Sequence, residues 1–402
     1  MTVVHQHVVY LCNAIDETTR WHRQITTDSP AATNKVLAIA NALRLAGIRC
    51  TVLSLGRGRQ NRTGRWYASE ARLSGKSSII YCAFIHLPLL THVVTAISLI
   101  ILVRHLVRNS ANVTLLSYNR AYHHIPALIL ARFLKVRSFL DLEDGYTLDG
   151  NGLIRDVKNK ITRCLFRWLC PHGVMVANSG LARQLDRTPG LVCYGVALNE
   201  ILPNQDWRSA RLQVLFSGTL LEEVGCKLLM GAVEILRGQQ PALVRELHFV
   251  VTGKGPYASA FRALAAQAPN WLTFGESLPR GAYLEAISSC HIGLSLRLAA
   301  HEMSATTFPS KVVEYAQYGL LVVSTRSSDV PLLFGDDALY LEDETASALA
   351  VMLAGLPHRR DELCNIANRG RARVLLRCSP ETVGAEIGHL LAQDFPAAAP
   401  GY

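Results

Sequence analysis

The chain has 402 residues, which is long for one hydrophobic core and comfortable for two domains of ordinary size. Half of the residues are apolar and 18% are charged, a composition that indicates a globular protein and excludes a disordered one. The net charge of +10 is uneven, because residues 1–205 carry +13 and residues 206–402 carry −3. Two parts of opposite charge indicate two domains with different partners.

The first part begins with a strand–helix–strand pattern. A short buried strand is expected at 8–12, a helix capped at Ser29–Pro30 or Thr33–Asn34 and ending at Gly47, and a strand at 49–55. This order is typical of a parallel, doubly wound sheet. The pattern continues with a strand at 113–119, a helix at 124–134, a strand at 136–145 and short strands at 174–177 and 192–194.

Two segments of this part indicate contact with a membrane. The first is a basic segment with Trp66 and Tyr67 inside it, which is expected to be a loop on an anionic membrane surface or simply a solvated loop. Its arginines are Arg57, Arg59, Arg62, Arg65 and Arg72. The second is the apolar run 87–103, which is short for a spanning helix and is interrupted by Pro88. We expect a buried or interfacial helix there, anchored by Arg104, His105 and Arg108.

The second part repeats the alternation of strands and helices after a linker at 203–207. Strands are expected at 214–220, 247–256, 271–276, 291–296, 320–325 and 338–341, and helices near 226–238, 257–267, 280–289, 344–356, 358–376 and 380–393. The predicted fold class is therefore α/β, with two successive doubly wound, Rossmann-like sheets. Ligands of such sheets lie beyond the carboxyl ends of the strands, so two facing sheets would form a cleft.

The segment Thr306–Gly319 (TTFPSKVVEYAQYG) is the most informative motif. It predicts a helix that opens at Pro309–Ser310, with Lys311 in its first turn and Glu314 three residues further on. Lys311 and the free N–H groups favour a phosphate, whereas the carboxylate of Glu314 suits the vicinal hydroxyls of a ribose. The alternative is an ordinary amphipathic helix with both side chains solvated.

Several strand ends place small or polar residues before this motif. Gly218 and Thr219 follow one strand, Gly253, Lys254 and Gly255 follow the next, and Arg297 ends a third. A small residue at such a position lets backbone N–H groups approach a phosphate. Their recurrence predicts a nucleotide site at one edge of the second sheet.

These motifs resemble those of the retaining, GT-B-type glycosyltransferases of the large group 1 family (family 4-like), of the kind that builds capsule, lipopolysaccharide and exopolysaccharide. FSGTL, GKGP, LTFGE and PSKVVEYAQYGLLVV match its successive signatures, most specifically between about residues 214 and 325. SPAATNKVLAIANALRLAG is similar to its first helix, and LLSYN and LDLEDG to the middle of its acceptor domain.

The resemblance implies a division of the chain and a set of site residues. Residues 1–205 would form a membrane-facing acceptor domain, 206–380 the nucleotide-sugar domain, and 381–402 a helix that packs back on the first domain. Lys311, Glu314 and the acceptor-side Glu143 are the expected catalytic residues. Donor binding is expected from Gly218, Thr219, Lys227, Gly253, Gly255, Arg297, Thr306, Thr307 and Ser310.

The chain also departs from the family pattern. Thr306 stands where many members have the first glutamate of a Glu-x7-Glu pair, and Thr219 and Val224 stand where basic residues are usual, with Lys227 nearby. No DxD metal motif is evident, since DLED at 141–144 lies in the acceptor part. Its Glu143 and Asp144 are expected to orient the acceptor, or else to act as a cap or a solvated pair. We expect the reaction to need no metal and no cofactor.

The leading prediction is a retaining hexosyltransferase that moves a sugar from a nucleotide-diphosphate sugar to a lipid-linked or polysaccharide acceptor. Its expected location is cytoplasmic, at the inner face of an anionic membrane. Ten cysteines without a CxxC pair favour reduced thiols, no secretory signal is apparent, and no nucleic-acid-binding signature is present. The alternatives are a nucleotide-sugar epimerase, which His123 and His124 leave open, and a degenerate relative that binds without catalysis.

Overall fold

The computed structural model describes residues 6–25, 28–58, 64–74, 77–87, 89–145, 153–185, 190–197, 205–301 and 303–393. Contacts divide the chain into two compact units. Unit 1 comprises 1–177, 181–196 and 379–402, and unit 2 comprises 178–180 and 197–378. The sequence placed these boundaries at 205/206 and 380/381.

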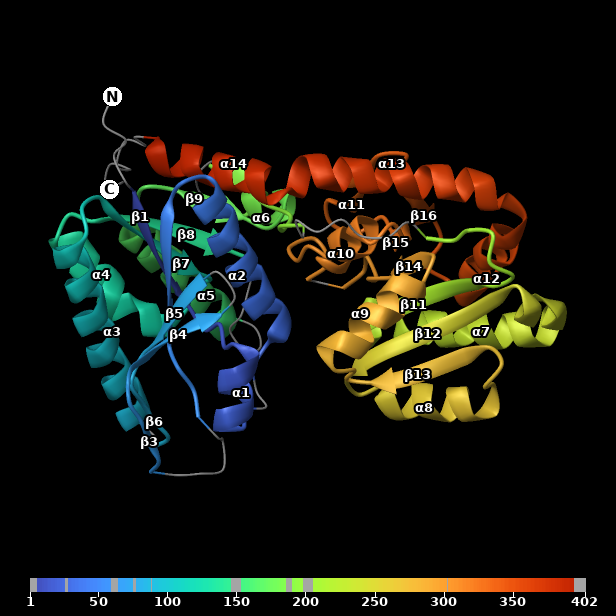
Figure 1. The fold of residues 1–402 in the computed structure, drawn as a ribbon, viewed down its shortest axis with the longest axis horizontal. Coiled ribbons are helices and arrows are strands. Elements are labelled where there is room, and N and C mark those ends of the chain that lie inside the picture. The colour runs from blue at the N-terminus through green and yellow to red at the C-terminus, as the bar shows by residue number, and fades with distance from the viewer. Residues whose placement is uncertain are drawn as a thin grey trace. The chain divides into compact units, whose positions relative to one another are not determined.

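Unit 1 contains a sheet of eight strands in the order β10-β9-β8-β7-β1-β2-β5-β4 (Figure 1). All pairs are parallel except β4 with β5. The strands are β1 (His7–Cys12), β2 (Arg49–Ser54), β4 (Glu70–Ser74), β5 (Ser77–Tyr81), β7 (Val113–Tyr118), β8 (Arg137–Leu142), β9 (Val174–Val176) and β10 (Leu191–Val192). The chain order reverses between β1 and β7, so the predicted doubly wound sheet is confirmed.

Helices cover both faces of this sheet. On one face, Val8, Tyr10 and Cys12 of β1 form a core with α2 (Pro30–Leu45) and α14 (Pro380–Ala392). The backbone of α14 approaches α2 so closely that a side chain at Gly384 would overlap the carbonyl of Ala42. The other face carries α3 (Leu90–Asn109), α4 (Ile125–Phe133) and α5 (Leu153–Leu169), with α3 and α4 side by side in Figure 1.

The basic segment differs from the predicted loop. Its described residues include strand β4 of the main sheet and strand β3 (Trp66–Tyr67), which pairs antiparallel with β6 (Phe84–Ile85) in a separate two-stranded sheet. Glu70 pairs with Arg72 and with the buried Arg23 of α1 (Glu17–Arg23), and these ion pairs allow charged residues at the edge of the sheet. Arg59 and Arg62 lie outside the described residues.

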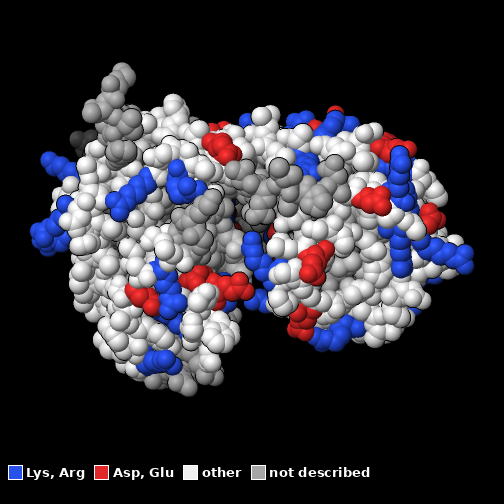
Figure 2. Space-filling view, in the orientation of Figure 1, with Lys and Arg blue, Asp and Glu red and all other residues white. Residues whose placement is uncertain are grey.

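The apolar run forms α3, which is largely exposed rather than buried. By length and composition α3 could cross a membrane, and it is the one helix among the described residues of which this is true. Only 17% of its most apolar 18-residue stretch is buried. Its outer side shows Val93, Ile97 and Ile101. On the visible face of unit 1 in Figure 2, Lys and Arg form separate small groups, and Asp and Glu lie beside one of them.

Unit 2 contains a six-stranded parallel sheet in the order β13-β12-β11-β14-β15-β16. The strands are β11 (Leu212–Thr219), β12 (Leu247–Lys254), β13 (Leu272–Glu276), β14 (Ile292–Ser295), β15 (Leu321–Thr325) and β16 (Leu339–Leu341). The helices are α7 (Cys226–Gln239), α8 (Ala258–Gln267), α9 (Arg280–Ser289), α10 (Lys311–Gln317), α11 (Val330–Phe334), α12 (Ala346–Gly355) and α13 (Arg360–Cys378). The order reverses between β11 and β14, so a ligand is expected at the carboxyl ends of these two strands.

Candidate functional site

The FPSK motif forms the start of α10. The helix begins at Lys311, and its buried residues include Val312, Val313, Tyr315 and Ala316. Gly319 ends it with φ +78, a conformation that favours glycine. The predicted helix is confirmed, although Pro309 and Ser310 precede it rather than open it.

Lys311 and Glu314 are directly paired. The Lys311 ammonium donates to Oε2 of Glu314 at 2.5 Å and to the hydroxyl of Tyr283, on α9, at 2.9 Å. The Tyr283 hydroxyl in turn donates to the same Oε2 at 2.9 Å. Lys311 Nζ also lies 4.5 Å from the centre of the Tyr283 ring, a cation–π distance.

A second set of contacts joins this group to β11. The hydroxyl of Ser217 lies 3.2 Å from that of Tyr283 and 3.0 Å from that of Tyr315. The backbone N–H of Ser217 also donates to the Tyr315 hydroxyl at 3.2 Å. We call Ser217, Tyr283, Lys311, Glu314 and Tyr315 the tyrosine–lysine network. Burial, and then the Glu314 carboxylate, raises the pKa of Tyr283, so its hydroxyl stays protonated.

The predicted glycines lie at the adjacent strand ends. Gly218 and Gly253 are paired in register across β11 and β12, with φ of +133 and +151. A Cβ at Gly253 would overlap the Gly218 carbonyl oxygen, and one at Gly255 would meet the Leu220 carbonyl at 2.5 Å. Close backbone packing therefore requires glycine at 253 and 255, independently of any phosphate. Thr219 follows Gly218 and is exposed.

The remaining predicted residues near α10 lie on the connection from β14. The backbone carbonyl of Arg297 accepts a 2.5 Å hydrogen bond from Thr325 at the end of β15. Thr306 is buried and Ser310 is exposed. Thr307 has a buried hydroxyl that makes no hydrogen bond to any described residue.

Lys227 is set apart from the tyrosine–lysine network. It lies in the first turn of α7, and its exposed ammonium pairs with Glu222 at 2.7 Å. Tyr257 donates to the other oxygen of Glu222 at 3.1 Å. No contact with the network is made by the described atoms of Lys227.

Glu143 lies in unit 1, directly after β8, within a buried polar cluster. Its carboxylate forms an ion pair with Lys35 of α2, and both side chains are less than 15% exposed. Asp141 lies two residues earlier and accepts a hydrogen bond from Tyr10. Burial, and then Glu143, raises the pKa of Asp141 to about 8, so Asp141 is largely protonated at neutral pH. We call Tyr10, Lys35, Asp141 and Glu143 the acidic cluster.

The two histidines considered for an epimerase are engaged locally. His123 contacts His92 at 2.9 Å, and His124 is buried against Ser117 at 2.9 Å. Burial lowers the pKa of His124 to about 3, so it stays neutral. Within the described ranges, no group of three or more His, Cys, Asp or Glu residues is arranged to hold a metal ion.

Some of these side chains were not predicted, namely Ser217, Tyr283 and Tyr315 in unit 2 and Tyr10, Lys35 and Asp141 in unit 1. Asp141 had a signal, because a carboxylate inside an apolar parallel strand needs a partner. No sequence signal pointed to Tyr283, because an aromatic residue in an amphipathic helix is usually part of a hydrophobic core.

Residues 211–356 match the family model of glycosyl transferases group 1. The fold of the whole chain is similar to solved structures of low sequence identity. Sucrose-phosphate synthase of Thermosynechococcus elongatus is 13% identical with a TM-score of 0.65, over 96% of this chain and 98% of that one. HepE of Anabaena, solved with UDP and glucose, is 14% identical with a TM-score of 0.66, over 96% and 100%. TarM is 8% identical with a TM-score of 0.67, over 96% and 99%. No protein of curated function matches by sequence.

The fold is thus that of the GT-B glycosyltransferases, with two Rossmann-like units. Residues 211–356 match a group 1 glycosyltransferase domain, and the solved structures of similar fold cover the rest of the chain as well. The tyrosine–lysine network lies entirely within that domain. An epimerase is not favoured.

Proposed function

We propose that the chain transfers a hexose-type sugar, with retention of configuration, from a nucleotide-diphosphate sugar to a lipid-linked or polysaccharide acceptor. The observation that carries the proposal is the tyrosine–lysine network, which holds one cation and one carboxylate where the order of the unit 2 sheet reverses. A nucleotide-diphosphate sugar has an anionic diphosphate next to a ribose, so its binding site needs a cation and a carboxylate close together.

Each group has a distinct role. The hydrogen bonds that described residues make to the Glu314 carboxylate all reach Oε2, so Oε1 is the oxygen we assign to the ribose hydroxyls. Lys311 would turn from Glu314 toward the diphosphate, where its charge stabilises the leaving group. Thr307, with its unengaged hydroxyl, and Ser310 would contact the phosphates or the sugar. No metal is proposed.

Two solved relatives support this choice of donor. HepE was solved with UDP and glucose, and a trehalose-6-phosphate synthase of E. coli with UDP-2-fluoro glucose. The base of the nucleotide used by this chain is not assigned by that likeness, because the sequence identities are 14% and 12%.

Unit 1 is proposed to bind the acceptor at the inner face of the membrane. Its layer of α3, α4 and α5 presents apolar side chains to solvent, among them Val93, Ile97 and Ile101 of α3 and Ile161 and Trp168 of α5. Such a surface fits a peripheral protein whose helices lie in the headgroup region. Glu143 would orient the acceptor hydroxyl if the Lys35 pair opens.

Thermal-shift titration with UDP-, GDP-, ADP- and dTDP-sugars tests the donor assignment, because only a donor that binds the folded state raises Tm. We expect one nucleotide class to raise Tm, and Lys311→Ala and Glu314→Ala to abolish that shift while the proteins stay folded. An unchanged shift in both variants rejects the assignment. Release of nucleotide diphosphate distinguishes an enzyme from a non-catalytic binder, and the anomeric configuration of the product tests retention.

A further inference from the structure

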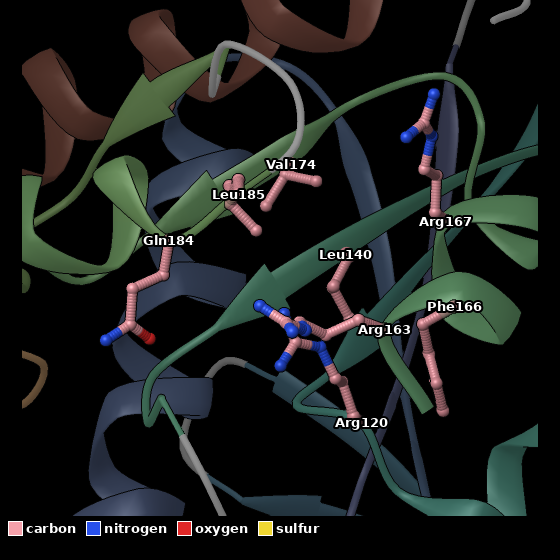
Figure 3. Close-up of a pocket in the computed structure, with 8 residues that line it drawn as sticks. All are labelled: Arg120, Leu140, Arg163, Phe166, Arg167, Val174, Gln184 and Leu185. Atoms are coloured by element: carbon pink, nitrogen blue, oxygen red, sulfur yellow. The ribbon is translucent and has the colours of Figure 1, made fainter. Parts of the chain in front are cut away.

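A small cavity in unit 1 is lined by three arginines. Arg120 follows β7, and Arg163 and Arg167 lie on α5, while Leu140, Phe166 and Val174 form an apolar wall. Figure 3 shows the guanidinium groups of Arg120 and Arg163 together in the middle of the view, with that of Arg167 set apart. The cavity is small, with a volume of about 20 Å³, which is room for about one water-sized group such as a phosphate oxygen.

The described lining of the cavity is positively charged. It contains no Asp or Glu. Arg163 Nε is buried and has no acceptor among the described residues, although buried donors normally have one. Arg120 is anchored by a 3.4 Å contact from Nη1 to the carbonyl of Gly145. An anion in the cavity would be attracted by both guanidinium groups.

We propose that this cavity, with Arg163 and Arg120 as its main ligands, binds a phosphate or diphosphate group of the acceptor. The inference deepens the proposed function, on which it rests, by assigning an anionic acceptor. Guanidinium groups match phosphate oxygens through paired N–H donors. Two cations at one cavity suit the charge of a phosphate monoester or a diphosphate better than the single charge of a carboxylate.

The other side of α5 indicates how a lipid carrier would reach the cavity. Val157, Ile161 and Trp168 are exposed at helical spacing along that side. One helix therefore presents an apolar row to the surroundings and an arginine, Arg163, to the cavity. This arrangement suits a phosphate at the boundary between headgroups and water.

The decisive variants are Arg163→Gln and Arg120→Gln, with Arg155→Gln as control, since Arg155 lies on the same helix but does not line the cavity. Binding is measured by flotation with phosphatidylcholine vesicles that contain polyprenyl phosphate or, at equal charge, phosphatidylglycerol. Binding of inorganic pyrophosphate is measured by calorimetry in a Lys311→Met background, which removes the cation of the donor site. Circular dichroism and Tm confirm folding.

We expect the wild type to bind the lipid phosphate more tightly than phosphatidylglycerol, or to bind pyrophosphate, and each cavity variant to lose about tenfold or more of that affinity. Preference for the lipid identifies a lipid-linked acceptor, and binding of pyrophosphate alone a soluble one. The Arg155→Gln variant should stay within about twofold of wild type.

The inference is overturned if both cavity variants bind as the wild type does. It is also overturned if the wild type neither prefers polyprenyl phosphate to phosphatidylglycerol nor binds pyrophosphate. The donor-induced thermal shift, measured on the same variants, separates this failure from failure of the proposed function. That shift depends on unit 2 residues and should be unchanged in all three arginine variants. If no donor raises Tm even in the wild type, the proposed function itself fails.

Discussion

The Lys311 ammonium lies 2.5 Å from the Glu314 carboxylate, and the two residues are three positions apart on α10. Each side chain is about one third exposed, so the pair is accessible to a ligand. Without a donor, the carboxylate therefore compensates the charge that would bind a diphosphate. Donor binding would exchange this contact for two others, one from phosphate to Lys311 and one from ribose to Glu314.

Tyr283→Phe tests whether Tyr283 positions this pair. The change removes the hydroxyl that contacts Ser217, Lys311 and Glu314 but keeps the ring under the ammonium. We expect the free energy of unfolding to fall by about 1–2 kcal/mol and donor affinity to fall about tenfold. Urea unfolding and donor titration measure the two effects.

Tyr257→Phe is the matched control, because Tyr257 donates to the exposed Glu222 outside the network. It should leave both quantities nearly unchanged. Equal donor affinity in the wild type and Tyr283→Phe would show that the hydroxyl has no positioning role.

Lys35→Met tests the ion pair in the acidic cluster. The change leaves the Glu143 carboxylate largely buried without its cation, and we expect a loss of about 3 kcal/mol or more in unfolding free energy. The double variant Lys35→Met/Glu143→Gln removes both charges and should recover much of that loss. A double variant as unstable as the sum of the two single variants would show that the residues do not interact.

Much of the fold could be predicted from the sequence because its core strands are apolar and several helices begin at a capping side chain, such as Ser29 of α2 and Ser379 of α14. The hydropathy pattern failed to indicate an element where polar residues are buried or where charged residues lie in a strand. The helix α5 was not predicted; its inner face contains the buried Asn159 and Thr162, while the apolar Ile161 is exposed. The edge strand β4 is charged and was expected to be a loop.

The contacts between side chains of the candidate site were predictable only where the residues are close in sequence. Lys311 and Glu314 lie on one helical turn, so their spacing alone indicates that they are neighbours. Tyr283 reaches them from another helix, and Lys35 reaches Glu143 from 108 positions away along the chain. Such contacts depend on how the elements pack, and no local pattern encodes them.

Asp141→Asn should remove a pH dependence of stability. The folded pKa of about 8 lies above the usual 3.8, so the folded state holds a proton that the unfolded state lacks between these values. This contribution is greatest at low pH and is lost as pH rises through about 8. Urea unfolding at pH 6, 7.5 and 9 should therefore show the wild type weakening with pH more than Asp141→Asn does. Parallel curves for the two proteins would contradict a raised pKa at this site.

Ile97→Gln/Ile101→Gln tests α3 as a membrane contact. Both isoleucines are more than half exposed, so their replacement should leave the fold unchanged while removing apolar area that would enter the headgroup region. We expect flotation with vesicles containing anionic lipid to weaken about tenfold. The control is Val351→Gln/Leu376→Gln, which changes two apolar residues of unit 2 that are even more exposed. An equal loss of vesicle binding in both double variants would indicate nonspecific hydrophobic adsorption rather than docking through α3.

Gly253→Ala separates the packing role of the strand-end glycines from a role in binding phosphate. The added methyl group would overlap the carbonyl oxygen of Gly218, and φ of +151 is unfavourable for alanine, so we expect a loss of about 3 kcal/mol or more in unfolding free energy. Gly238→Ala is the control, because that residue lies in α7 with nothing within 4 Å of the added atom. It should raise stability by about 0.5–1 kcal/mol. If Gly253→Ala unfolds like the wild type but loses its donor-induced shift, the glycine serves the ligand rather than the contact between β11 and β12.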